Sequence, residues 1–304
     1  MNLRIVFMGS PEFAVPTLNS LAKQHNLVGI ITQPDRPAGR GRTLTPPPVK
    51  ILAQDLGLPF FQPIKLRQPE VMEQLHQWAP DIIVVAAFGQ ILRKEILDLP
   101  PYGCINVHAS LLPRWRGAAP INAAILNGDD VTGATIMRMD AGIDTGPILS
   151  QRSELIRPND TTAILSRRLA EIGARLLIET LPGYLNGEIH PYPQDDTRAT
   201  YAPMLRKDDG ALDFEQTASA LERRVRAFQP WPGAYMEWSG NMLKVMSAKV
   251  IETADRMFPG ERLVYNGFPA VHTAMGLLVL EEVQPAGKKS MSGKAFLQGA
   301  KLWA

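Results

Sequence analysis

An amide and an imidazole stand two residues apart, at Asn106 and His108, where an apolar run that begins at Cys104 ends. Side chains two apart in a β-strand point to the same face of a sheet, so a strand here would project both groups into one space. An amide can donate to an oxyanion that develops during a reaction, and an imidazole can move a proton. Because open α/β sheets hold their ligands at strand ends, the pair is a candidate catalytic set.

A carboxylate at Asp144, in the turn-like sequence Asp140-Ala-Gly-Ile-Asp144-Thr-Gly-Pro, could complete this set. Paired with His108, it would fix the tautomer and the orientation of the ring. Each residue also has a plain structural interpretation: Asn106 and His108 as a strand end bonded to loop backbone, and Asp144 as a turn former or cap. The loop Arg114-Trp-Arg-Gly117 that follows the strand favours an anionic or electron-rich ligand, because a helix is expected directly after it.

Short apolar runs alternate with helical patterns over residues 3–188, which predicts an α/β domain with a doubly wound, mostly parallel sheet. Strands are expected at 4–8, 27–32, 82–88, 104–108 and 135–139, and helices at 13–23, 48–55, 70–78, 90–97, 120–126 and 161–185. The first domain is therefore placed at 1–188, and the aperiodic, turn-rich residues 189–206 are interpreted as a linker.

The remaining residues, 207–304, carry one expected helix at 217–228, which the sequence Gln229-Pro-Trp-Pro-Gly must end. Short β-like segments follow at 234–238, 243–251, 261–264 and 270–280. Several short strands within such a length predict a small antiparallel β-barrel, which we expect to be OB-like.

Length and composition agree with a two-domain protein that can bury a sizeable core, with 304 residues of which 45% are hydrophobic. The net charge of +2 neither favours nor excludes a nucleic-acid partner, so only local clusters of basic residues can argue for one. Cys104 is the only cysteine, which excludes an intrachain disulfide. We expect no secretory leader and no membrane span, and a reducing cytoplasm fits best.

Longer motifs around these residues resemble a known family. Asn106-x-His108-x-Ser110-Leu-Leu-Pro-x-x-x-Gly117, together with Asp144, is similar to the 10-formyltetrahydrofolate-dependent formyltransferase family. The resemblance extends to both ends of the chain, through the segments that begin at Phe7, Gln33, Gln229 and Ser292. It therefore spans both expected domains.

The resemblance implies transfer of a formyl group from 10-formyltetrahydrofolate to the amino group of methionine on charged initiator tRNA, in the bacterial cytoplasm. It assigns catalysis to Asn106, His108 and Asp144, with the first two polarising the formyl oxygen and Asp144 orienting His108 and relaying a proton through water. It also implies a folate-binding set at Phe88, Gln90, Ile91, Leu92, Ser110, Leu111, Leu112 and Pro113. No metal is expected, because the other histidines are scattered at His25, His76, His190 and His272.

Two groups of basic residues are candidates for contact with the tRNA. In the family the loop at 34–50 approaches the acceptor end of tRNA, which assigns Arg36, Arg40 and Arg42 to it; by itself, a basic loop is as readily a solvated surface excursion. The second group is Lys244, Lys288 and Lys289. Because residues 207–304 hold 12 Lys and Arg against 11 Asp and Glu, a patch exists there only if the fold segregates the charges.

Three other functions remain open on the sequence. A dinucleotide-dependent oxidoreductase would share the βα pattern, but Gly9-Ser-Pro-Glu-Phe-Ala lacks the later glycines of its phosphate-binding turn. A formyltransferase acting on a small amine would share the Asn-His-Asp set, and an RNA-binding adaptor could retain an inert domain. The basic loop and the second domain favour tRNA, the intact set favours an enzyme, and a monomer is the default expectation.

Overall fold

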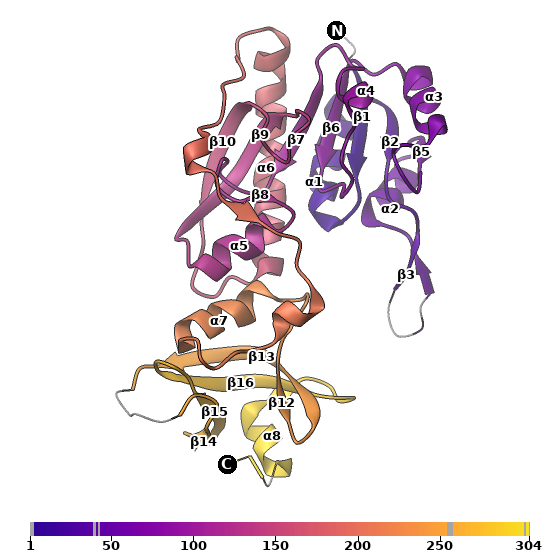
Figure 1. Cartoon of the computed structure of the whole chain (residues 1–304). Helices are drawn as coiled ribbons and strands as arrows, with labels where there is room; N and C mark the ends of the chain where they lie inside the picture. The colour runs from indigo at the N-terminus through magenta and orange to yellow at the C-terminus, as the bar shows by residue number, and fades with distance from the viewer. Residues whose placement is uncertain (1–2, 39–40, 42, 254–257, 301, 304) are drawn as a thin grey trace. The chain divides into compact units, whose positions relative to one another are not determined.

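A computed structural model describes residues 3–38, 41, 43–253, 258–300, 302 and 303 of the chain (Figure 1). The chain divides into two compact units. The first unit comprises residues 1–120, 131–155 and 166–202, and the second comprises 121–130, 156–165 and 203–304. Two short stretches from within the expected first domain, 121–130 and 156–165, therefore group with the C-terminal part. The sequence-based boundaries at 188 and 207 remain a prediction.

A seven-stranded sheet forms the centre of the first unit, in the order β10-β9-β7-β6-β1-β2-β5. All neighbouring strands from β5 to β7 are parallel, whereas β9 is antiparallel to both of its neighbours. The doubly wound, mostly parallel sheet is thus confirmed. Its strands are β1 (Arg4–Gly9), β2 (Asn26–Ile31), β5 (Phe60–Phe61), β6 (Ile82–Ala86), β7 (Cys104–His108), β9 (Val131–Arg138) and β10 (Ile148–Leu155).

Both faces of this sheet are buried, as the continuous apolar run of β1 requires. Ile5 and Phe7 pack into a cluster with residues of α1, α2 and α6, whereas Val6 and Met8 pack into a second cluster with residues of α3 and α4. Alternate residues of one strand therefore contact helices on opposite faces. The helices are α1 (Val15–Gln24), α2 (Pro48–Asp55), α3 (Pro69–Trp78), α4 (Lys94–Leu97) and α6 (Thr162–Leu185).

The order of the strands reverses between β1 and β6. From β1 the chain adds β2 and β5 on one side, and then crosses to add β6 and β7 on the other. The loops that leave the carboxyl ends of β1 and β6 diverge at this point, which is where open α/β sheets bind ligands. A site is therefore expected among the residues that follow β1, β6 and β7.

One helix expected in the first unit is much shorter than the sequence predicted. The pattern at 90–97 gives only α4, at Lys94–Leu97. Ala87 and Gly89 have φ of 45° and 77°, which interrupts regular structure directly after β6. The side chain of Gln90 accepts a hydrogen bond from the backbone of Leu66 at 3.0 Å, so residue 90 belongs to a loop braced by another loop.

Several short elements were not predicted. The edge strand β10 was missed, and so was the hairpin of β3 (Arg36–Ala38) and β4 (Thr43–Thr45), which projects from the first unit (Figure 1). The expected linker is partly ordered on the first unit, because β11 (Tyr201–Ala202) pairs in parallel with β8 (Arg116–Gly117). A 3₁₀ turn, η2, lies at Asp196–Arg198.

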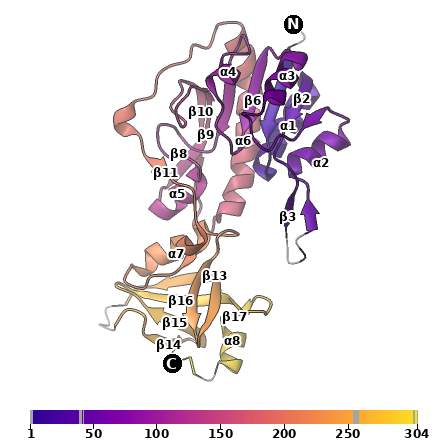
Figure 2. The ribbon, with the colours of Figure 1, turned by 45° about the vertical axis from the view of Figure 1, so that its right-hand side comes forward.

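The second unit contains an antiparallel sheet in the order β12-β13-β16-β15-β14, with β17 paired to β16 (Figure 2). This confirms a small antiparallel β domain. The segment 270–280 was expected as one strand, but a turn at Gly276, with φ of 86°, separates two. The strands are β12 (Ala234–Trp238), β13 (Asn241–Ile251), β14 (Arg262–Tyr265), β15 (Phe268–His272), β16 (Leu277–Pro285) and β17 (Met291–Ser292).

Helices complete the second unit. The helix expected at 217–228 is α7 (Ala218–Ala227), and α5 (Pro120–Asn127) agrees with its sequence pattern. The helix α8 (Gly293–Gly299) was not predicted; the hydroxyl of Ser292 caps it, and Phe296 packs edge-on between Trp238 and Trp303. None of the helices in the described part of the chain is long and apolar enough to cross a membrane.

Candidate active site

Strand β7 brings Asn106 and His108 to the end of the sheet, as the two-residue spacing predicted. Asn106 pairs with Val85 of β6 on one side and with Met137 of β9 on the other, and its side chain is 9% exposed. Among the residues that the structure describes, none hydrogen-bonds with the Asn106 amide. The amide atoms are not among the buried polar atoms that lack a partner in the described structure, so they reach solvent. Asn106 is thus available to donate to a bound substrate.

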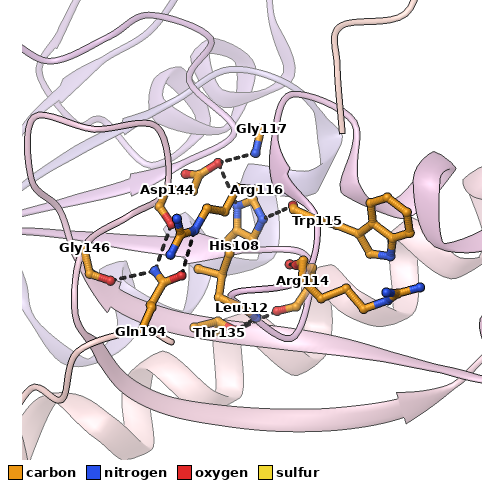
Figure 3. A network of polar contacts seen from close by, with 11 residues as sticks. His108, Leu112, Arg114, Trp115, Arg116, Gly117, Thr135, Asp144, Gly146 and Gln194 are labelled. Atoms are coloured by element: carbon orange, nitrogen blue, oxygen red, sulfur yellow. Dashed lines mark hydrogen bonds and ion pairs between the residues drawn. The ribbon is translucent and has the colours of Figure 1, made fainter. Parts of the chain in front are cut away.

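The His108 ring is held from both sides (Figure 3). Nε2 lies 3.0 Å from the carbonyl oxygen of Trp115, and Nδ1 lies 3.6 Å from Oδ2 of Asp144. A carbonyl oxygen can only accept, so Nε2 carries a proton. Nδ1 is then the nitrogen left for chemistry, because 3.6 Å is longer than a hydrogen bond to the carboxylate.

Asp144 lies on a turn whose backbone is unusual for a residue with a side chain. Its φ is 53°, in the left-handed region that costs an L-residue roughly 1–2 kcal/mol. Oδ2 accepts a hydrogen bond of 2.8 Å from the backbone of Gly117. Within the same turn, the carboxylate of Asp140 accepts from the Gly142 backbone and from the hydroxyl of Thr145. The turn thus holds Asp144 against the loop that follows β7.

The loop 109–113 is shaped by a buried hydroxyl on β9. Thr135 donates through Oγ1 to the Ser110 carbonyl at 2.6 Å and accepts from the Leu112 backbone at 3.1 Å. Gln151 on β10 donates to both Thr135 and the Leu112 carbonyl. Neither Thr135 nor Gln151 was named from the sequence, because a threonine and a glutamine inside strands carry no local signal of a role.

The residues expected to bind folate in this loop fall into two kinds. The Ser110 hydroxyl is buried and donates to the Arg114 carbonyl at 2.6 Å, and the Leu112 side chain is 3% exposed. These two shape the loop. Leu111 and Pro113 are partly exposed, so their side chains are the ones that can touch a ligand.

The residues after β6 line a hollow of about 440 Å³ at the point where the strand order reverses. Its walls come from the ends of β1 and β6 and from the β3–β4 hairpin, and they include Phe88 and Arg36. Of the other residues expected to bind folate, Ile91 is 73% exposed and Leu92 is buried among apolar side chains. The Gln90 side chain hydrogen-bonds with the backbone of the loop at 64–66.

A second set of contacts, missed from the sequence, comes from the expected linker. Gln194 donates through Nε2 to the carbonyl oxygens of Asp144 and Gly146, at 2.8 and 2.7 Å (Figure 3). Its Oε1 accepts from Nε of Arg116 at 2.9 Å, and Arg116 also donates to Asp196. No local pattern signals this set, because its members lie far apart along the chain and Gln194 stands in an aperiodic run.

The basic residues expected to contact tRNA are only partly placed. Arg40 and Arg42 lie outside the described residues, and the guanidinium of Arg36 donates to the side chain of Gln33 at 3.0 Å. In the second unit, Lys244 on β13 pairs with Gln284 on β16, whose side chain donates to the Lys288 carbonyl at 2.9 Å. Exposed Lys244, Lys288 and Lys289 therefore gather at one end of that sheet.

Cys104, at the deep end of β7, is a packing residue. Its side chain is 1% exposed, and burial raises the pKa of the thiol to about 12. A thiol with that pKa is almost entirely protonated near neutral pH and is a poor nucleophile. In the described residues no cluster of three or more His, Cys, Asp or Glu side chains could hold a metal ion.

Comparisons with known protein families cover both units. A profile described as formyl transferase matches residues 3–181, and one described as formyl transferase, C-terminal domain, matches residues 204–301. Two relatives that are each 50% identical are the methionyl-tRNA formyltransferases of Chloroflexus aggregans, over 98% of this chain and 97% of the relative, and of Myxococcus xanthus, over 98% and 96%.

Solved structures with low sequence identity share the fold. HypX from Aquifex aeolicus, in complex with tetrahydrofolic acid, has a TM-score of 0.66 at 18% identity; 99% of this chain is covered, but it spans only 48% of HypX. The N-formyltransferase from Helicobacter canadensis, in complex with folinic acid and dTDP-3-aminofucose, has a TM-score of 0.66 at 17% identity, covering 92% of this chain and 99% of that one. Both family matches, and the relatives that match over nearly their full length, show that the chain belongs to the formyl transferase family, among its methionyl-tRNA formyltransferases.

Proposed function

We propose that this formyl transferase moves the formyl group of 10-formyltetrahydrofolate to the amino group of methionyl initiator tRNA, using Asn106, His108 and Asp144. The product, N-formylmethionyl-tRNA, serves translation initiation. The observation that carries the catalytic assignment is the amide of Asn106, which has no hydrogen-bond partner among the described residues, on the same strand end as a histidine held between Trp115 and Asp144. We further propose that the enzyme acts as a monomer in the bacterial cytoplasm.

The reaction forms one carbon–nitrogen bond and breaks another. The amine nitrogen attacks the formyl carbon, and the carbonyl oxygen becomes an oxyanion in a tetrahedral intermediate. Since the Nε2 proton of His108 is held by Trp115, Nδ1 carries a second proton in the positively charged ring, and this Nδ1–H and the Asn106 amide donate to that oxygen; each such donor is worth roughly 3 kcal/mol of barrier. The bond from the formyl carbon to N10 of the folate then breaks, and tetrahydrofolate leaves.

Asp144 serves the proton balance of this reaction. The attacking amine must lose a proton and N10 must gain one, so a relay between them conserves the count. Oδ2 of Asp144 lies 3.6 Å from Nδ1 of His108, so both groups border the space in which the substrate would react. The carboxylate accepts the amine proton through water and passes it on to N10 as the bond from the formyl carbon to N10 breaks, and its negative charge stabilises a positively charged His108.

We assign the substrates to surfaces on both sides of this set. The folate lies against the partly exposed side chains of Leu111 and Pro113 and against Phe88, because a flat ring system suits an apolar wall with nearby backbone groups. The hollow that Phe88 shares with Arg36 admits the aminoacyl end of the tRNA. The tRNA backbone meets Arg36, Arg40 and Arg42 on the loop at 34–50, and Lys244, Lys288 and Lys289 on the second unit.

A formyl-transfer assay with three acceptors tests the function. We expect rapid transfer from 10-formyltetrahydrofolate to methionyl initiator tRNA, slow transfer to methionyl elongator tRNA and negligible transfer to a free amine such as an amino sugar nucleotide. Equal rates on both tRNAs would refute selection of the initiator. Faster transfer to the amino sugar nucleotide would show that the acceptor is a small molecule.

A further inference from the structure

Both polar atoms of the Gln194 side chain form hydrogen bonds, and two of these bonds hold the turn that carries Asp144. Its Nε2 donates to two carbonyl oxygens of that turn, at Asp144 and Gly146, while its Oε1 accepts from Arg116. These bonds use both amide hydrogens and the oxygen (Figure 3). The contact joins residues 50 positions apart in sequence, so it is a tertiary brace and not part of the local turn.

We propose that Gln194 is a positioning residue for the formyl transfer: through the backbone of the turn, it sets where the Asp144 carboxylate stands relative to His108. This rests on the function proposed above for Asp144. Gln194 itself bonds to backbone carbonyls and to Arg116, so its effect on the reaction passes through Asp144.

The turn needs an external brace because its conformation is unfavourable by itself. Asp144 has a φ of 53°, in the left-handed region that residues with a side chain seldom adopt, while Gly146 lies so close to the Arg138 carbonyl that only a glycine fits. Such a backbone persists only where surrounding contacts fix it. Without the brace, relaxation of the turn would carry Oδ2 away from the Gly117 backbone and from Nδ1 of His108.

Arg116 fixes the direction in which the Gln194 amide points. A guanidinium N–H can only donate, so the oxygen of the amide must face Arg116 and its NH₂ group must face the two carbonyls. Arg116 is 2% exposed, and its charge is balanced by Asp196, which lies on the same stretch of chain as Gln194. The segment after residue 190 therefore supplies Gln194, which holds the turn, and Asp196, which balances the charge of the arginine that orients the Gln194 amide.

The substitution Gln194→Glu tests this with almost no change in shape. A carboxylate can still accept from Arg116, but it places an oxygen where an N–H donated, against the carbonyls of Asp144 and Gly146. We expect kcat to fall about 100-fold, the effect of a displacement of about 1 Å at a reacting group. The KM for 10-formyltetrahydrofolate should stay within about threefold, because the folate wall is not touched.

Two companion variants separate positioning from general damage. Gln194→Met removes both donors without adding a charge, and we expect it to lower kcat by the same factor. It therefore replaces Gln194→Glu in the test if that variant does not fold. Gln77→Glu, the same change at an exposed glutamine of α3 whose side-chain oxygen accepts from Gln74, should leave kcat, KM and the thermal midpoint of unfolding unchanged.

A double-mutant cycle with Asp144→Ala, measured by single turnover with enzyme in excess, decides the route. If Gln194 acts through Asp144, then Gln194→Glu lowers the rate about 100-fold in the wild type and less than about threefold once Asp144 is absent. An equal loss in both backgrounds, or a Gln194→Glu enzyme with wild-type kcat while Asp144→Ala is crippled, would overturn the positioning role. Wild-type turnover by Asp144→Ala would instead refute the proposed catalytic set.

Discussion

In the first unit the proposed catalytic side chains are buried and braced, whereas the lysines proposed to hold RNA in the second unit stand exposed on a strand and a turn. His108 is 6% exposed and held by contacts to Trp115 and Asp144. Lys288 and Lys289 follow the end of β16 and reach into solvent. Catalysis in the first unit should therefore depend on the geometry of its side chains, and RNA binding in the second unit on the number of its positive charges.

This difference predicts how large an effect each substitution has on kcat and on tRNA affinity. Removing one braced group changes the barrier directly, because its position relative to the reacting atoms is fixed before substrate arrives. An exposed lysine interacts through a high dielectric and is screened by salt, so each one contributes little and several add up. Effects on kcat should thus concentrate in the first unit, and graded, salt-dependent effects on tRNA affinity should concentrate in the second.

The largest expected effects are those of His108→Ala and Asp144→Ala. Each should lower kcat by about 10²–10⁴-fold, the usual contribution of a positioned proton-transfer group. Binding of tetrahydrofolate, measured by titration, should change little, because the folate wall is formed by other side chains. If both variants turn over at the wild-type rate, the geometry at β7 has no bearing on the reaction, and the contrast between the units disappears.

A smaller effect is expected from Thr135→Val, which removes the hydroxyl that shapes the loop at 109–113. The change leaves the Ser110 carbonyl and the Leu112 backbone N–H without that partner, and it should destabilise the fold by about 1–3 kcal/mol. The KM for 10-formyltetrahydrofolate should rise roughly tenfold, the equivalent of about 1.4 kcal/mol. Denaturant unfolding and steady-state kinetics measure the two effects.

The same strand offers a matched control for that substitution. The Thr132 hydroxyl is buried and has no hydrogen-bond partner in the described structure, so Thr132→Val removes an unsatisfied polar group. It should leave KM unchanged and the free energy of unfolding equal or higher. Equal loss of stability in both variants would show that the Thr135 hydrogen bonds do not matter, and that only the shape of the side chain does.

The sequence predicted those parts of the molecule whose signals are local. The strand 104–108 and the helix 48–55 match the structure residue for residue, because a buried apolar run and a proline-started helical pattern each lie within a few positions. The spacing of Asn106 and His108 fixed their common face in the same way. The family resemblance and the two-unit fold class were also available before any coordinates.

What the sequence could not supply depends on contacts between distant segments. The bond between Arg116 and Gln194 joins residues 78 positions apart, and nothing in the aperiodic run around Gln194 indicates its partner. Residues 90–93 were expected to be helical from their pattern, but the left-handed backbone at Ala87 and Gly89 and the contact of Gln90 with another loop prevent a helix there. Tertiary context decides such segments, and a single-sequence pattern does not contain it.

In the second unit, Lys288→Ala combined with Lys289→Ala should weaken methionyl initiator tRNA binding by several-fold without changing kcat. The plot of log affinity against log salt should become shallower by about one unit for each phosphate that the protein no longer neutralises. Lys294→Ala is the control, because this lysine lies on α8 with its ammonium over the Phe268 ring. A fall in kcat with an unchanged salt slope would show that these lysines act through their position, as the catalytic side chains do. It would contradict the proposed difference between the two units.

The smallest effect on activity is expected at Cys104, which shares β7 with the catalytic pair but lies at its buried end. Burial raises the pKa of its thiol from 9.0 to about 12, so the folded protein keeps the proton at a pH where the unfolded chain loses it. The stabilisation is therefore complete below pH 9 and is lost as pH rises toward 12, at about 1.4 kcal/mol per unit. A thiol reagent at about pH 8, where a free thiol reacts readily, should label the native enzyme only at the rate of unfolding, and kcat should persist meanwhile. Rapid labelling of native enzyme, with loss of turnover, would show that the deep end of β7 is open to the site and that chemistry and packing are not separated along this strand.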